Sequence, residues 1–107
     1  MFYLNKIIDD LSFVLKNTNK NTKKDLEDNE ILLDSIMFRI IQISENNKKL
    51  SSDFKYRNSN VPWAAINGMR NIIVYDYGNV SIEIIFDTVS NGIPYMCEQL
   101  VEGKNKE

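Results

Sequence analysis

The sequence predicts an all-α protein, folded as an antiparallel four-helix bundle with a short extra helix at its C-terminal end. Apolar residues recur at intervals of three and four along four segments, which is the spacing of one face of an α-helix. The connections between these segments are short, as they are between antiparallel neighbours in bundles. We find no convincing alternation of apolar and polar residues of the kind that indicates a β-strand.

The length and composition of the chain fit one small globular domain. It has 107 residues, of which 43% are hydrophobic and 26% are charged, a balance that is ordinary for a protein with a packed core. We assign residues 1–102 to the helical domain. Residues 103–107 are expected to form a frayed polar tail.

Each of the first two helices is defined by one apolar face. The first ends in the polar stretch 17–21, whose side chains compete for backbone hydrogen bonds. The second extends from Asp28 or Asn29 to Leu50, and a loop is expected over residues 51–61. The two faces consist of Leu4, Ile7, Ile8, Leu11, Val14 and Leu15, and of Leu33, Ile36, Ile40, Ile43 and Leu50.

Proline and glycine delimit the remaining helices. Pro62 suits the first turn of the third helix, because the N–H that it lacks would have no partner there. Gly78-Asn79 predicts a left-handed cap at the end of that helix. Ser81 fits the N-cap of a fourth helix, which Asn91-Gly92 would end. Pro94 then begins the short extra helix, which reaches about residue 101.

Charge and termini restrict the class of function. The net charge is −2 and the sequence pI is about 5.2, so the chain does not neutralise phosphates broadly and any contact with RNA would be local. The N-terminal residues do not resemble a signal peptide, and no apolar run is long enough to span a membrane. We therefore expect a soluble cytoplasmic protein with no membrane partner.

The content of cysteine and histidine excludes several kinds of site. Cys97 is the single cysteine and there is no histidine, so an internal disulfide is impossible and a Cys–His nucleophile is absent. We interpret Cys97 as a small apolar residue on a helix. No metal ion or cofactor is expected.

The block from residue 62 to residue 77, PWAAINGMRNIIVYDY, resembles the signature of the HepT-like family of the HEPN superfamily. In that family Pro-Trp opens a helix, and Gly-Met-Arg-Asn, three apolar residues, His, one further residue and Tyr follow in order. The resemblance extends over nearly the whole chain, through 4–8, Ser44-Glu45, 48–51, 84–89 and Ile93-Pro94. The joined pattern is considerably more specific than a bare Arg-Asn and Tyr would be.

The resemblance implies a definite function. Such proteins are toxins of two-gene toxin–antitoxin systems, and their partner is a small nucleotidyltransferase of the MntA type. They act as homodimers that cleave RNA, with tRNA a candidate substrate, and need no metal. The motif Arg and His of both subunits meet at the dimer cleft. The partner neutralises the toxin by adding AMP to the motif tyrosine, which is Tyr77 here.

The chain departs from its family at the position that performs proton transfer. Arg70 matches the motif arginine, which would hold the phosphate with its planar fork, and Asn71 would either orient Arg70 or cap a local turn. Tyr75 stands where the family has histidine, and a tyrosine is a poor base at neutral pH although it can still donate a proton. Asp76 is a less favoured base. Ser44 and Asn46 replace small residues, which would alter the approach of the helices.

Helical geometry relates these positions to one another. Arg70 and Tyr77 are about two turns apart and share a face, whereas Tyr75 lies about 140° around the helix from Arg70. One chain therefore cannot easily bring Arg70 and Tyr75 together, but two apposed helices of a dimer can.

Alternatives remain at each of these residues. Arg70 could be a structural ion-pairing residue and Tyr77 a half-buried tyrosine, while Trp63 is interpreted as core packing. Lys48-Lys49 and the stretch 23–25 are interpreted as solvated faces.

Two functions therefore stay open: a weak or altered RNA-cleaving toxin, and a non-catalytic helical dimer that binds the nucleotidyltransferase. Whether the chain is an enzyme is left undecided, and position 75 could also carry a laboratory substitution.

Overall fold

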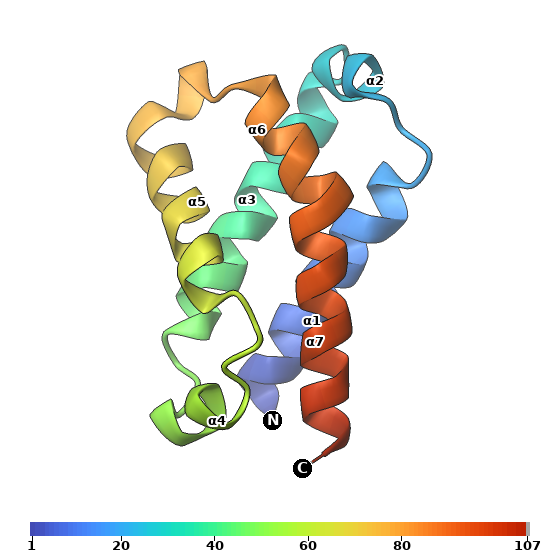
Figure 1. Cartoon of the computed structure of the whole chain (residues 1–107). Helices are drawn as coiled ribbons and strands as arrows, with labels where there is room; N and C mark the ends of the chain where they lie inside the picture. The colour runs from blue at the N-terminus through green and yellow to red at the C-terminus, as the bar shows by residue number, and fades with distance from the viewer. Residues whose placement is uncertain (107) are drawn as a thin grey trace.

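The computed structural model describes residues 1–106, which are almost entirely helical and contain no β-strand (Figure 1). The all-α prediction is therefore confirmed. In chain order the elements are α1 (Phe2–Thr18), α2 (Lys23–Glu27), α3 (Glu30–Asn47), α4 (Ser52–Arg57), α5 (Trp63–Asp76), a 3-10 turn (Tyr77–Asn79), α6 (Ile82–Asp87), a π-helical turn (Thr88–Gly92) and α7 (Ile93–Asn105).

The long helices pack pairwise around one apolar core. Helix α1 lies against both α3 and α7, and α3 lies against α5. The completely buried side chains come from all of these helices and include Ile7, Leu11, Ile36, Ile40, Ile43, Ile73, Ile93 and Leu100. Helices α1 and α3 thus turn their predicted apolar faces inward, where burial of a face contributes most of a helix's stability.

An ion pair fastens α1 to α3 inside this core. Asp10 Oδ1 lies 2.7 Å from Arg39 Nη1, and only 3% of the Asp10 side chain is exposed. The Arg39 guanidinium also lies 3.8 Å from the centre of the Phe13 ring, an arrangement that favours a cation. Neither partner could be paired from the sequence, because the two residues are far apart along it.

The C-terminal third differs from the prediction. Helix α6, the π-helical turn and α7 continue one another as a single bent helix from Ile82 to Asn105, as the orange-to-red segment of Figure 1 shows. The predicted break at Asn91-Gly92 and the separate short helix are wrong. Gly92 has ordinary right-handed helical angles (φ −65°, ψ −50°). The wider π-helical turn accommodates Pro94, whose ring would clash with a carbonyl in a regular helix.

Helix α7 also extends further than expected. It ends at Asn105, and Gly103 is buried, so the prediction of a frayed tail is wrong for residues 103–105. A Cβ atom on Gly103 would lie 2.4 Å from Asn58 Oδ1. Glycine is therefore needed there for close approach to the end of α4. Glu107, the last residue of the predicted tail, lies outside the described residues.

Two short helices and one helix end also differ from the prediction. Helix α2 begins with a capping box, in which Thr22 and Asp25 each accept a hydrogen bond from the other's backbone N–H. Helix α4 occupies the predicted loop and is capped by Ser51. At the end of α5, Gly78 has no positive φ, and the chain leaves the helix through the 3-10 turn instead of a left-handed cap.

No helix among the described residues is both long enough and apolar enough to cross a membrane.

Candidate active site on the α3–α5 face

Two candidate site residues on α5 and the turn that follows it reach across to α3. Arg70 Nε lies 3.2 Å from Glu45 Oε1, and the Tyr77 hydroxyl donates a hydrogen bond of 2.9 Å to Asp34 Oδ1. Arg70 and Tyr77 therefore share one face, as their spacing predicts. We call this surface the α3–α5 face and define it by Asp34, Glu45, Arg70, Asn71 and Tyr77.

The Arg70 guanidinium is held from two sides. Its Nε faces Glu45 as an ion pair rather than as an aligned hydrogen bond, and its Nη1 donates to Asn71 Oδ1 at 3.1 Å. About a quarter of the side chain, 26%, stays exposed. The contact between Asn71 and Arg70 that the sequence predicts is present. The ion pair with Glu45 is present too, as expected if Arg70 has a structural role. An arginine held in this way keeps its planar fork in one orientation.

A buried polar cluster supports this part of the face. Ser44 Oγ donates to Asn67 Oδ1 at 2.7 Å, and Asn47 Nδ2 donates to the same oxygen at 3.2 Å. Ser44 and Asn47 are almost completely buried, so these bonds fix how α3 and α5 sit against each other. Asn67 lies one turn before Arg70. The family has a small residue at the position of Ser44. Serine fits there because its hydroxyl donates a hydrogen bond to Asn67.

Tyr77 has a partly open phenol with a carboxylate partner. Its side chain lies in the 3-10 turn after α5 and is 46% exposed. The hydrogen bond to the Asp34 carboxylate, followed by burial and the charge of Asp34, raises the pKa of Tyr77 above its ordinary value. The hydroxyl is therefore protonated at neutral pH and reachable from solvent.

Tyr75 does not join this group within one chain. It is 80% exposed and lies on the regular part of α5, about 140° around the helix from Arg70. Asp76 is also exposed. The structure thus agrees with the expectation that a single chain does not bring Arg70 and Tyr75 together.

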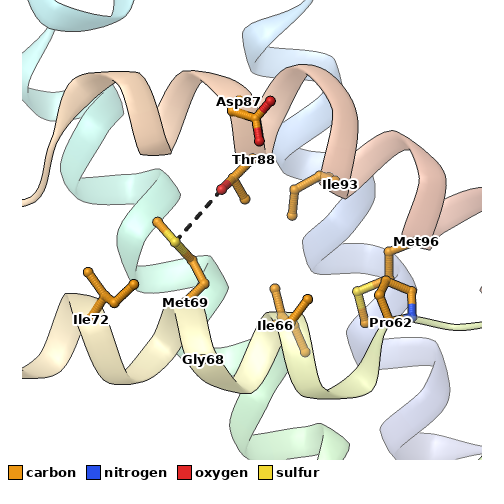
Figure 2. Close-up of a pocket in the computed structure, with 11 residues that line it drawn as sticks. Pro62, Ile66, Gly68, Met69, Ile72, Asp87, Thr88, Ile93 and Met96 are labelled. Atoms are coloured by element: carbon orange, nitrogen blue, oxygen red, sulfur yellow. Dashed lines mark hydrogen bonds between the residues drawn. The ribbon is translucent and has the colours of Figure 1, made fainter.

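An apolar pocket lies on a different side of α5. It has a volume of about 390 Å³ and separates α5 from the bent C-terminal helix, as Figure 2 shows. Ile66, Met69 and Ile72 line it from α5, and Ile93 and Met96 line it from α7. The Thr88 hydroxyl donates to Met69 Sδ at 3.7 Å, and Asp87 is the one charged residue among the described lining residues.

This pocket contains neither Arg70 nor Tyr77. Arg70, Glu45 and Tyr77 therefore lie outside this pocket, on the α3–α5 face.

The other residues singled out from the sequence have structural surroundings. Burial raises the pKa of the Cys97 thiol, which disfavours the reactive thiolate. Trp63 packs edge-on against Phe54 and donates from Nε1 to Asn58 O at 3.2 Å, so its interpretation as core packing is confirmed. Within residues 1–106, no group of three or more His, Cys, Asp and Glu side chains is arranged to hold a metal ion.

Comparison with known proteins identifies the family. Residues 7–102 match the family described as Ribonuclease HepT-like, and the chain therefore belongs to it. The resemblance that the Arg70 block indicates is thus confirmed. RNA cleavage is the class of chemistry for which this family is named.

Two relatives show how much of each protein is shared. A protein of Caldanaerobacter subterraneus subsp. tengcongensis, named a putative RNase, is 29% identical over 105 residues, covering 98% of this chain and 94% of that protein. A Methanocaldococcus jannaschii protein, named gamma-glutamylcyclotransferase and putative RNase, is 27% identical over 100 residues, covering 94% of this chain. Those residues make up only 45% of the second relative. No solved structure matches the chain significantly.

Proposed function

We propose that this chain is the toxin of a HepT-type toxin–antitoxin system. In this role it is a metal-independent RNA endonuclease whose activity is weak because Tyr75 occupies the position of the family histidine. The observation that carries the proposal is the α3–α5 face, where Arg70 is oriented by Glu45 and Asn71 while remaining partly exposed. As RNA is the substrate, we place the action of the protein in the cytoplasm.

Arg70 has the chemistry that RNA cleavage requires. The attack of a ribose 2′-hydroxyl on the neighbouring phosphorus builds up negative charge on the phosphate oxygens. A guanidinium held by two neighbours meets that charge without reorganising, and its fork matches two oxygens. We therefore assign to Arg70 the stabilisation of the transition state.

We propose that a homodimer completes the site, with α5 of one subunit facing α5 of the other. Gly68 supports this arrangement. A Cβ atom there would meet no heavy atom within 4 Å, although glycine inside a helix costs about 1 kcal/mol relative to alanine. The surroundings of Gly68 in the described chain do not require a glycine, whereas the close approach of a second helix would. The exposed Ala65 and Ile72 lie beside it and, like Gly68, line the apolar pocket. A second helix would therefore approach on the side of α5 that carries Tyr75.

Tyr77 is the residue that we propose as the acceptor of AMP from an MntA-type nucleotidyltransferase. Its hydroxyl is partly exposed and lies about two helical turns from Arg70. A nucleotide attached there would add charge and bulk beside Arg70, which would exclude RNA from the same face.

Co-expression with the nucleotidyltransferase encoded beside this chain tests the toxin–antitoxin assignment. Intact mass should show one added AMP on the native chain and none on Tyr77→Phe, while Tyr3→Phe serves as the matched control and keeps the addition. An unmodified native chain, with the partner active on another substrate, would remove Tyr77 from this role.

One observation favours a second function, a non-catalytic dimer that docks the nucleotidyltransferase. The exposed Tyr75 replaces the imidazole that is suited to both proton transfers. If no form of the chain cleaves RNA but the partner still binds and modifies it, this second function applies.

A further inference from the structure

We propose that Glu45 is the proton acceptor of the RNA cleavage reaction in this histidine-free chain. The inference rests on the proposed ribonuclease function and identifies a further catalytic residue for it. The motif contributes the arginine but, with Tyr75 in place of histidine, no base. Glu45 lies on α3, outside the Arg70 block, and the structure brings its carboxylate to the guanidinium of Arg70.

Proximity to the phosphate-binding group decides which carboxylate can act. The 2′-hydroxyl that attacks and the phosphate that it attacks belong to the same nucleotide, so the base must lie beside the cation that holds the phosphate. Glu45 Oε1 is 3.2 Å from Arg70 Nε. Asp34 contacts Tyr77 instead, about two helical turns from Arg70.

Two cations lie beside the Glu45 carboxylate. Arg70 Nε and Lys48 Nζ approach its Oε1 at 3.2 and 3.5 Å. The side chain is 41% exposed, so a ribose can approach it from solvent. A carboxylate can accept a proton directly, whereas a phenol hydroxyl would first have to lose its own.

The proposed step balances as an ordinary transesterification. The Glu45 carboxylate takes the proton of the 2′-hydroxyl as the 2′ oxygen forms its bond to phosphorus, and Arg70 holds the phosphate oxygens. The bond from phosphorus to the 5′ oxygen breaks, and that oxygen takes a proton from water. The products are a 2′,3′-cyclic phosphate and a 5′-hydroxyl end, and Glu45 returns its proton to solvent.

A purely positioning role for Glu45 would have a different signature. Glutamine has the same shape and its amide oxygen can still accept a hydrogen bond from Arg70, but it cannot act as a base. A residue that only orients Arg70 would matter equally whether or not another base is present. If Glu45 is the base, its replacement would lower the cleavage rate only in a chain that has no histidine to take over the proton transfer.

The test is therefore a double-mutant cycle on an oligoribonucleotide containing one preferred cleavage site. Cleavage rates are measured for the native chain, Glu45→Gln, Tyr75→His and the double variant, with Glu98→Gln on the exposed surface of α7 as the matched control. We expect Glu45→Gln to slow the native chain by about 100-fold or more. The loss in the Tyr75→His background should be much smaller, since imidazole then supplies the base.

The pH profile provides a second, independent readout. The Tyr75→His rate should decline below the reference imidazole pKa of about 6.5, whereas the native rate should show no decline at that point, because the native chain has no imidazole. RNA affinity should not weaken in Glu45→Gln, because the change removes a negative charge from beside Arg70.

The possible outcomes separate this inference from the ribonuclease function. Equal losses in both backgrounds, or no loss in the native chain, would overturn Glu45 as the base while leaving the ribonuclease function intact. The same conclusion follows if only Tyr75→His cleaves. If none of the proteins cleaves RNA, the proposed ribonuclease function itself is wrong and the inference falls with it.

Discussion

Two sides of helix α5 are built in opposite ways. The side toward α3 is held by polar contacts, from the buried Ser44 and Asn47 at Asn67 to the Glu45–Arg70 ion pair and the Asp34–Tyr77 hydrogen bond. The side toward the bent C-terminal helix instead borders an apolar pocket. An apolar pocket is the usual first choice for an active site, but here Arg70, Glu45 and Tyr77 lie on the polar side.

This difference also explains how an exposed site can be well ordered. Each polar contact joins a residue on α5, or on the turn after it, to α3, and α3 in turn packs against α1. Arg70 is therefore positioned by the fold although it lies at the surface. On the pocket side the hydrogen bond between Thr88 and Met69 Sδ joins the two walls, so a variant there should act through packing or association and not by removing a reacting group.

The largest expected effect is on RNA cleavage, and it distinguishes the polar side of α5 from the pocket side. In the Tyr75→His background, Arg70→Ala should reduce the rate of RNA cleavage by about 100- to 1,000-fold, because a preorganised charge at the phosphate is lost. Thr88→Val, on the pocket side, should leave the rate nearly unchanged. Initial rates on labelled tRNA measure both, and equal losses would show that the two sides are not functionally distinct.

The next effect concerns association through the exposed part of α5. Gly68→Ala should weaken the proposed dimer by about 1–3 kcal/mol, since a methyl group would enter a tight contact. The same change should stabilise the isolated subunit by up to about 1 kcal/mol. Analytical ultracentrifugation and urea unfolding of dilute protein measure the two quantities. A dimer of unchanged affinity would place the interface elsewhere.

The buried polar cluster should contribute a smaller and purely structural effect. Ser44→Ala removes one of the two donors to Asn67 Oδ1 and should lower the free energy of unfolding by about 1 kcal/mol. Urea denaturation measures this change, with Ser12→Ala on the exposed surface of α1 as its control. If Ser44→Ala were as stable as the native chain, the cluster would not fix the position of α5.

The smallest expected effect is a change in the pKa of Tyr77. The raised pKa of Tyr77 should fall back toward the reference value of about 10 in Asp34→Ala, because the carboxylate that accepts its proton is removed. The Tyr77–Asp34 contact therefore contributes stability that is present below the unfolded-state pKa and is lost as pH rises through the higher folded-state pKa. NMR of labelled tyrosine rings resolves Tyr77 from the other tyrosines, and an unchanged midpoint would contradict the contact.

Local patterns predicted a large part of this structure. The apolar faces of α1 and α3 follow directly from helical spacing, and the same spacing correctly places Arg70 and Tyr77 on one face. Helices α2 and α4 were missed, although Thr22 with Asp25 and Ser51 are recognisable capping residues. The polar composition of both segments concealed Leu26 and Phe54, which are buried.

The prediction was wrong where long-range packing overrides a local signal. Asn91-Gly92 and Pro94 ordinarily interrupt a helix, yet the π-helical turn carries the chain through them while Val89, Ile93 and Met96 stay in the core. Glu45 and Asp34 were not identified as neighbours of the site for a related reason. Both contacts join α3 to residues that are far away along the sequence. Ser44-Glu45 belongs to the stretches that resemble the family, but no local pattern pairs Glu45 with Arg70 or Asp34 with Tyr77.

The most direct test of the central claim compares RNA cleavage by the native chain and by Tyr75→His on total tRNA. The ribonuclease assignment predicts that restoring the histidine increases the rate by about 100-fold or more, and that Arg70→Ala abolishes the gain. Absence of cleavage by both proteins, with each folded and dimeric, would contradict a ribonuclease site on the α3–α5 face.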